Sequence, residues 1–489
     1  MAEVCPFRGL RYNQKLIKDL AQVICPPFDV ITPEQQNLYY ERNSYNAIRL
    51  EHPLDTHYDE LGSSKYTRAA SSFKQWLERG ILEFDDHPVF YLHDHYFTDH
   101  LSGSGGKERR RRGLVARVKL APWGSSIHPH EETLSKTKDD RLPLMRACRA
   151  NFSPLFALYQ DSEQRIPQIL SQVECLRPII ECYWDEPVVR EPVLRRSEHH
   201  VVWAITDPEL QQQISRSLAA KALYVADGHH RYETALAYQE ERDQCHSKRE
   251  EAFNYVMMTL VDFSDPGLVN LPVCRLVRGI APSALAGLKK QLENFFTLES
   301  ISLPQDLLAS YHCEPKVQTE QRGGETTSKI IDKAILVILG LEPQSLVVLT
   351  PRPDVSIEAM MPANRSRVYK TFELSILNHV ILDKIMGVID CHSEGMHQSN
   401  VAASRSSDGS QETATRTRSE GGDPRVSYTV DIGEAYQQVK EGKYQLAFLL
   451  NPPRPEIIKA VVEAGDRLPP KSTYFYPKVP AGLVFNSLD

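Results

Sequence analysis

Short apolar runs bounded by polar residues predict strands at several places along the chain. They lie at 89–92, 114–120, 222–226, 255–261, 346–349 and 445–450. Apolar residues at three- and four-residue spacing predict helices between them. These span 33–42, 66–79, 142–150, 207–218, 232–242, 281–296, 373–386 and 455–464. Because strands and helices are mixed along the chain, we expect a mixed α/β fold.

Three polar stretches are predicted to be loops. Residues 101–113 contain four consecutive arginines, Arg109 to Arg112, which we expect at a hairpin tip in contact with water. Residues 316–328 are polar and hold two adjacent glycines. Residues 391–425 have few large apolar side chains and are predicted to be disordered. A strand pattern resumes at 426–430, so this insert should interrupt one domain. We expect domains at 1–240 and 241–489.

Composition narrows the class of protein. The chain has 489 residues, of which 41% are hydrophobic, as in ordinary globular proteins. No apolar run approaches the ~20 residues that span a bilayer, and the N-terminus lacks a signal-peptide pattern, so we expect a cytoplasmic protein without a membrane partner. The nine cysteines form no CxxC pair, which favours reduced thiols. The net charge of -7 argues against nucleic acid as a partner.

The segment 225–233 carries the strongest candidate chemistry. A strand should end at Asp227, turn through Gly228 and begin a helix near His230. The free N–H groups and positive dipole end of a helix start suit a phosphate. His229, His230 and Arg231 add further donors there. We therefore predict a phosphate or nucleotide site, the alternative being a solvated turn with a helix-capping aspartate.

A second charged stretch, 128–141, supplies both carboxylates and cations, as phosphoryl transfer requires. Its candidates are Glu131, Lys138 and Arg141. The alternative is a charged surface loop that caps the following helix. His128 and His130 have no third ligand at metal-binding spacing, so no metal site is expected.

Five further residues are candidate substrate contacts, each with a structural alternative. Asp29 follows a Pro-Pro turn that it could merely stabilise. Asn46 and Arg49 stand at the entry of an expected strand, and the sequence is equally compatible with a role in a turn or at a strand edge. Lys471 and Ser472 belong to an aromatic loop that could simply close its domain.

Several motifs occur together in one order along the chain. They lie at 6–12, 26–30, 45–46, 130–133, 138–141, 151–154, 226–238 and 470–477. With these motifs the chain resembles the conserved family known as domain of unknown function 1015. The turn 228–231 also resembles the phosphate-holding turn of ParB-like proteins and sulfiredoxin. The resemblance implies a ParB/sulfiredoxin-like nucleotide-binding core with a second mixed α/β domain.

The resemblance also implies a function in serine or phosphoserine metabolism. We expect a nucleotide-dependent free serine kinase, or an enzyme of the reverse, phosphoserine-consuming reaction. Its ligands would be ATP or ADP (or CTP), Mg²⁺ as a further cofactor, and a small amino acid; a homo-oligomer is compatible with the sequence. The alternative is a non-catalytic ParB-like regulator that binds nucleotide.

In the enzyme hypothesis the residues of the two charged stretches have separate roles. Glu131 would be the general base or would position the hydroxyl group. Asp227 and His230 complete the expected catalytic set, with Asp29 or Asp227 orienting the substrate ammonium or Mg²⁺. The phosphate-binding set comprises Gly228, His229, His230, Arg231, Lys138 and Arg141.

Overall fold

The computed structural model describes residues 2–56, 64–100, 106–132, 138–186, 197–243, 251–302, 318–322, 325–329, 336–388 and 425–489. The chain forms two compact units. The first comprises residues up to His100, Gly106–Val269 and Phe475–Asp489, and the second contains Asn270–Tyr474. The boundary thus follows Val269 where the sequence suggested 240, and the last residues return to the first unit.

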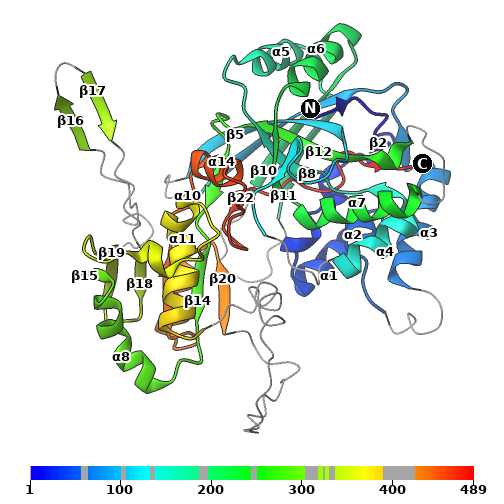
Figure 1. Ribbon diagram of the computed structural model, residues 1–489. Coiled ribbons are helices and arrows are strands. Elements are labelled where there is room, and N and C mark those ends of the chain that lie inside the picture. Colours follow the sequence, from blue (N-terminus) through cyan, green and yellow to red (C-terminus); the bar gives the residue numbers. More distant parts are fainter. Residues whose placement is uncertain are drawn as a thin grey trace, which may run out of the picture. The chain divides into compact units, whose positions relative to one another are not determined.

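The first unit is built on a nine-stranded mixed sheet (Figure 1). Its path runs β6 (Ile127–Pro129), β11 (Leu223–Asp227), β8 (Leu155–Tyr159), β12 (Tyr255–Asp262), β5 (Lys107–Lys119), β4 (Phe90–Asp99), β10 (Ser197–Ile205) and β9 (Ile180–Asp185). β1 (Val4–Cys5) pairs with β5 off this path. β6 is parallel to β11, and β8 is parallel to β12. All other neighbours are antiparallel.

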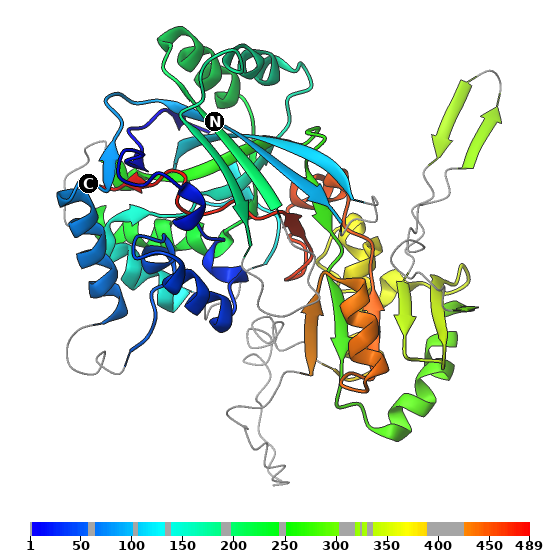
Figure 2. The same ribbon diagram turned by 180° about the vertical axis from the view of Figure 1, so that it is seen from behind.

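Each face of this sheet packs into its own apolar core, so the sheet is the middle layer of the unit. One core includes Leu92, Leu114 and Val201 together with α5 (Arg165–Val173) and α6 (Pro208–Ala219). The other includes Tyr91, Val115 and Val202 together with the helices of the N-terminal half. These are η1 (Leu20–Gln22), α1 (Pro33–Arg42), α2 (Ile48–Glu51), α3 (Lys65–Glu78) and α4 (Lys138–Cys148). The two groups of helices lie on either side of the sheet in Figures 1 and 2.

The remaining elements of the first unit are short or lie at the ends of the sheet. Two small strand pairs join β2 (Leu10–Tyr12) to β3 (Leu82–Phe84) and β7 (Ala150–Asn151) to β23 (Asn486–Ser487). α7 (His229–Asp243) follows β11 directly and packs on α4. The 3₁₀ turns η2 (Phe28–Val30) and η5 (Ala252–Asn254) complete the unit.

The second unit has a six-stranded antiparallel sheet. Its order is β15 (Phe296–Ser302), β19 (Ser345–Pro351), β18 (Leu336–Leu339), β21 (Leu446–Leu449), β14 (Cys274–Val277) and β20 (Val426–Thr429). Its helices are α8 (Pro282–Glu293), η6 (Ile357–Met360), α10 (Arg367–Thr371), α11 (Glu373–Ile376), the π-helix η7 (Leu377–Ile385), α13 (Ile432–Lys440) and α14 (Pro455–Glu463). β16 (Gln318–Arg322) and β17 (Glu325–Lys329) form a hairpin. Strands β13 (Val269–Leu271) and β22 (Tyr474–Tyr476) lie where the chain passes between the units.

The mixed α/β fold is confirmed, and helices or strands occupy every segment where the periodicity predicted them. Two loop predictions are wrong. Residues 107–113 continue β5, and residues 318–322 and 325–329 form β16 and β17. Arg49 lies in α2 and not at the entry of a strand. Residues 101–105 and 391–424 lie outside the described residues; β20 begins at Val426 in the second unit, so the predicted insert interrupts that unit.

The four arginines form part of a strand and not a loop, because their side chains have partners on both faces of the sheet. Some pair with carboxylates, and Arg111 lies in the sheet interior. Arg112 donates to Asp94 at 2.8 Å, and Arg109 donates to Asp99 at 2.8 Å. Arg111 is only 2% exposed. Successive residues of a strand point to opposite faces, so alternate arginines meet different partners. Arg109 and Arg112 are therefore paired with carboxylates, and Arg111 lies in the sheet interior.

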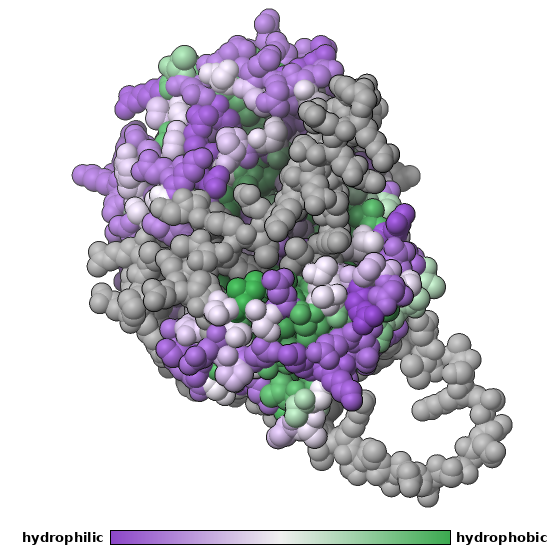
Figure 3. Space-filling model, turned by 90° about the vertical axis from the view of Figure 1, so that its left-hand side faces the viewer, coloured by the Kyte–Doolittle hydropathy of each residue, from purple (hydrophilic) through white to green (hydrophobic). Residues whose placement is uncertain are grey.

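Within the described ranges, no helix is both long and apolar enough to cross a membrane. On the face shown in Figure 3, hydrophilic residues predominate and apolar residues form small separate patches.

Truncation of a side chain in the sheet interior tests the two-core arrangement. Leu114 on β5 is fully buried, so Leu114→Ala should lower the free energy of unfolding by about 2–5 kcal/mol. Leu176→Ala is the control, because Leu176 is 52% exposed and its loss should change stability by less than about 0.5 kcal/mol. Urea unfolding followed by far-UV circular dichroism measures both. Equal effects of the two substitutions would contradict the arrangement.

Candidate functional site

The candidate site begins where β11 ends. β11 ends at Asp227, and α7 begins at His229, so the predicted strand–turn–helix is confirmed. β6 runs parallel beside β11 and ends at Pro129, two residues before Glu131. Because adjacent parallel strands present their carboxyl ends at one edge of a sheet, Glu131 and Asp227 lie at the same edge.

Gly228 makes the turn between β11 and α7 possible. Its φ of +88° is in the left-handed region that glycine adopts without strain. A Cβ atom at this position would lie only 3.0 Å from the guanidinium of Arg231. The glycine therefore lets Arg231 lie directly against the turn.

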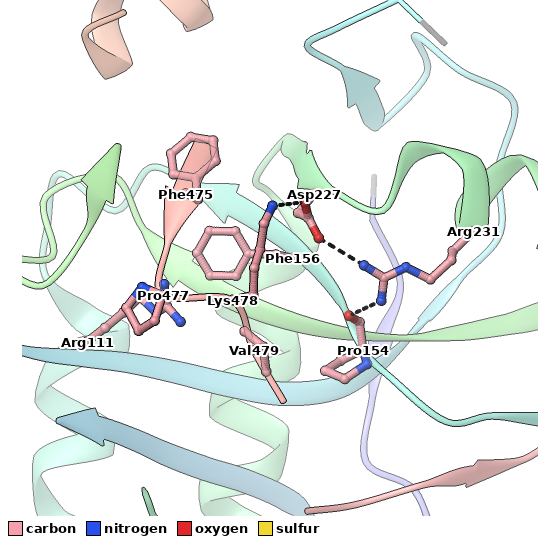
Figure 4. A pocket seen from close by; sticks show the side chains of 9 residues that line it. All are labelled: Arg111, Pro154, Phe156, Asp227, Arg231, Phe475, Pro477, Lys478 and Val479. Carbon is pink, nitrogen blue, oxygen red and sulfur yellow. Dashed lines mark hydrogen bonds and ion pairs between the residues drawn. The ribbon is translucent and has the colours of Figure 1, made fainter. Parts of the chain in front are cut away.

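Asp227 is the centre of an ion-pair network (Figure 4). Its carboxylate accepts from Arg231 at 2.9 Å and also from the ammonium of Lys478. Arg231 donates in addition to the Ser153 hydroxyl at 2.9 Å and to the Pro154 carbonyl at 2.8 Å. Burial alone would raise the pKa of the Asp227 carboxyl, but the charges of Lys478 and Arg231 outweigh burial and lower it. Asp227 is thus ionised at neutral pH.

These charged groups line a pocket of about 240 Å³, part of it open to solvent. Its charged lining consists of Arg111, Asp227, Arg231 and Lys478, and its apolar lining consists of Pro154, Phe156, Phe475, Pro477 and Val479. All nine residues belong to the first unit. With three cations and one carboxylate, the pocket has an excess of two positive charges. Such a pocket suits an anion, and phosphate above all.

Arg111 is held in this lining by contacts on both sides. Its guanidinium donates to the Tyr476 carbonyl at 3.2 Å and lies 5.0 Å from the centre of the Phe156 ring. A second nitrogen contacts His95 Nδ1 at 3.1 Å. Burial lowers the pKa of Arg111 to about 10, so the guanidinium is charged at neutral pH.

The residues after β6 form the neighbouring wall. His130 is buried, and its Nδ1 donates to the Val225 carbonyl at 2.6 Å. Its Nε2 lies 3.8 Å from the Glu131 carboxylate, whose side chain is 17% exposed. Burial lowers the pKa of His130, so the imidazole is neutral at pH 7. His229 Nε2 accepts from the His130 backbone N–H at 3.3 Å, which joins this wall to the start of α7.

The structure thus brings together six of the predicted residues: Gly228, His229, His230 and Arg231 at the turn, with Asp227 and Glu131 beside them. His230 is the second residue of α7 and is half-buried. Lys138 begins α4, and its side chain lies outside the described residues. The Arg141 guanidinium lies 3.9 Å from the centre of the Phe28 ring and donates to the Glu51 carbonyl at 2.6 Å. Arg141 therefore has a packing role in this structure.

The five predicted substrate contacts lie elsewhere than the pocket lining. Asp29 is exposed in η2. Asn46 is buried and donates to two backbone carbonyls, while Arg49 donates to the Tyr40 carbonyl at 2.8 Å. In the second unit, Lys471 is exposed with a φ of +58°, and the Ser472 hydroxyl donates to the Pro469 carbonyl. Asn46, Arg49 and Ser472 therefore have structural partners of their own.

Sequence reasoning missed Lys478 and Arg111. Lys478 stands at the end of the same C-terminal motif as Lys471, but nothing in the motif indicates that the chain changes units between them. Arg111 was missed because it belongs to a run of four arginines that was predicted to be a loop. The signal that could have found it is strand periodicity, which places Arg109 and Arg111 on one face and Arg110 and Arg112 on the other.

Comparison with known proteins identifies the family. Residues 4–370 match the family described as "Protein of unknown function (DUF1015)", so the chain belongs to this family. No curated protein matches the chain. The similar solved structures include a conserved hypothetical protein from Pyrococcus furiosus, at 12% identity and a TM-score of 0.31, covering 76% of this chain and 93% of that chain. They also include a free serine kinase in complex with AMP, at 12% identity and a TM-score of 0.30, covering 74% of this chain and 86% of that chain. At these TM-scores neither similarity carries an argument about activity.

The ion pairs of Asp227 predict how stability depends on pH. Asp227→Asn leaves Arg231 and Lys478 without their buried counter-charge, so it should cost about 3 kcal/mol of unfolding free energy at pH 7. Because the folded-state pKa of Asp227 is lowered, its contribution is complete above the unfolded-state pKa of about 3.9. It is lost as the pH falls further through the folded-state pKa.

Urea unfolding of both proteins between pH 7 and pH 3 measures this contribution. The difference between wild type and Asp227→Asn should stay constant down to about pH 4 and shrink below it. A difference that grows as the pH falls would contradict the assigned charge state.

Proposed function

We propose that the pocket at the end of β11 binds the phosphate of a small molecule and that the protein is a phosphoryl-transfer enzyme. The observation that carries the proposal is the set of three largely buried cations, Arg111, Arg231 and Lys478, around a single carboxylate. Charges withdrawn from water are costly unless they are paired. A phosphate dianion would balance the two positive charges in excess.

The proposed substrates are an adenine nucleotide and serine, or the same pair in the reverse direction. Arg231 and the first N–H groups of α7 would contact the phosphate, where a helix N-terminus favours negative charge. Mg²⁺ would accompany the nucleotide. We propose serine as the substrate because of the family that the chain's motifs resemble. We propose a phosphate ligand because of the charged groups that line the pocket.

Glu131 is the proposed general base. In the kinase direction a bond forms between the serine oxygen and the γ-phosphorus, the bond from phosphorus to the β–γ bridging oxygen breaks, and the hydroxyl proton passes to the Glu131 carboxylate. Glu131 fits this role because it is partly exposed and lies at the same sheet edge as Asp227. Asp227 fits it poorly, since its lowered pKa makes it a weak base. Its role here is to hold the two cations in place.

The phosphate proposal predicts a specific loss of binding. Lys478→Met removes one cation of the pocket and should weaken binding of ATP, ADP or phosphoserine by at least about tenfold. Titration calorimetry of serine, phosphoserine, ATP, ADP and CTP, with and without Mg²⁺, measures the change. Lys18→Met, an exposed lysine of the same unit, is the matched control and should bind like the wild type. Equal binding by the two variants would contradict the assignment of the pocket.

The catalytic proposal predicts a separate loss of turnover. Glu131→Gln keeps the shape of the side chain but cannot take a proton, so kcat should fall by about 10²–10⁴ while nucleotide affinity changes little. The assay follows transfer of labelled phosphate from ATP to serine, and the reverse reaction from phosphoserine to ADP. Glu163→Gln, whose side chain is 64% exposed, is the control.

The two measurements separate the proposed enzyme from a regulator. Nucleotide binding that depends on Lys478, with no turnover by the wild type in either direction, would favour the nucleotide-binding regulator. Wild-type turnover by Glu131→Gln would reject Glu131 as the base.

A further inference from the structure

Three histidines meet inside the first unit, on the sheet face that carries the second apolar core. His93 and His95 lie two residues apart on β4 and therefore share that face with Tyr91. His200 on β10 is the direct cross-strand partner of His95. All three side chains are buried.

The ring nitrogens of these histidines converge on one another. One nitrogen from each ring lies within 4.8 Å of the other two. His93 Nε2 and His200 Nδ1 also form a hydrogen bond with each other at 3.1 Å. Two ligands of a tetrahedral metal ion with bonds of about 2.1 Å are about 3.4 Å apart. The cluster is therefore close to the size that a bound metal ion requires.

Glu198 adds a carboxylate to the cluster. Its Oε2 lies 2.6 Å from His95 Nε2 and 3.6 Å from His200 Nε2. The shorter distance is a hydrogen bond, and the longer one exceeds hydrogen-bonding range. Among the described residues, His200 Nε2 has no hydrogen-bond partner although it is fully buried. A nitrogen and a carboxylate oxygen at this separation are spaced like two ligands on either side of a metal ion.

The His95 ring has a partner at both nitrogens. Its Nδ1 accepts from the Arg111 guanidinium at 3.1 Å, so its Nε2 carries the proton of the hydrogen bond to Glu198. A metal ion bound at this Nε2 would displace the proton to solvent.

We propose that His93, His95, His200 and Glu198 form a binding site for one divalent transition-metal ion of the Zn²⁺, Fe²⁺ or Mn²⁺ class. Three nitrogens and one carboxylate oxygen are ligands that these ions prefer, whereas Mg²⁺ and Ca²⁺ prefer oxygen ligands. The sequence analysis expected no metal site, because it considered only His128 and His130, which lack a third ligand at metal-binding spacing. Here the third histidine, His200, lies 105 positions after His95 on another strand. The metal site itself is independent of the proposed phosphoryl transfer, whereas any coupling between the metal and a phosphate rests on the proposed function.

Arg111 connects this cluster to the anion pocket. Its guanidinium contacts His95 Nδ1 at 3.1 Å and also lines the pocket. A positive charge at this position repels a metal ion, and an anion in the pocket offsets that charge. The metal and a phosphate should therefore bind cooperatively, each raising the affinity for the other by the same factor.

Metal binding by the full-length protein tests the proposal without nucleotide or serine. The protein is treated with EDTA, titrated with Zn²⁺ by calorimetry and with Co²⁺ by visible absorption, and its metal content is measured by mass spectrometry. We expect one site per chain and a Co²⁺ spectrum typical of nitrogen and oxygen ligands. Repeating the titration with inorganic phosphate present should tighten metal binding.

Two substitutions and a control locate the site. His200→Ala should weaken Zn²⁺ binding at least about a hundredfold, and Glu198→Gln, which keeps the side-chain shape, by about 10–100-fold. His199→Ala is the matched control, because His199 lies on the opposite sheet face, stacked on Tyr183. Circular dichroism establishes whether each variant is folded. If His200→Ala does not fold, Glu198→Gln alone tests the location of the metal site.

Three results would overturn the proposal. They are the absence of stoichiometric binding by the folded wild type, wild-type affinity in the folded Glu198→Gln variant, and equal losses in the His199 and His200 variants. None of them bears on phosphate binding, because Lys478→Met tests that property at a different group.

Discussion

The first unit depends on one buried carboxylate. Asp227 joins the end of β11, the first turn of α7 and the chain segment after β22, through Arg231 and Lys478. The turn from β11 to α7 and the segment after β22, far apart in the sequence, are thereby fixed at one point, and the Arg231 guanidinium extends the network to Ser153 and Pro154. Three cations and one carboxylate line the pocket, so its lining has a positive excess.

Arg111 extends this polar region into the sheet. It lies between the anion pocket and the histidine cluster, and it contacts both. Polar groups in a sheet interior cost stability unless they are paired, so such a concentration within one face is unusual for a purely structural layer. The apolar core around Tyr91 and Val202 holds these groups apart from water. Burial strengthens the electrostatic interactions of the pocket's charged groups.

Much of the fold could be predicted from the sequence, because it depends on local patterns. The periodicity located β11, α7 and α1. The turn at Gly228 was predicted from residue types alone, since only glycine adopts its φ without strain. The predicted residues Asp227 and Arg231 consequently lie in the pocket.

What the sequence could not provide depends on tertiary contacts. The sequence of Arg109 to Arg112 is typical of a solvated loop, but these residues form a strand because Arg109 pairs with Asp99, Arg112 pairs with Asp94, and Arg111 is buried. Asn46 was predicted to contact substrate, but its side-chain amide donates to the backbone carbonyls of Gln22 and Ile24. Lys471 and Lys478 belong to one motif but to two units. No local pattern distinguishes these cases.

The return of the chain to the first unit has a consequence for biosynthesis. Lys478 is 251 positions after its partner Asp227, and Asn270–Tyr474 of the second unit are encoded between them. On the ribosome, the second unit emerges before the lysine does, and domains generally fold as their residues emerge. A nascent chain therefore has Asp227 and Arg231 but not Lys478, and the strand β23 that pairs with β7 is also missing. The pocket is completed only after Asn270–Tyr474 have been synthesised, so a nascent chain that stops before Lys478 cannot have the finished site.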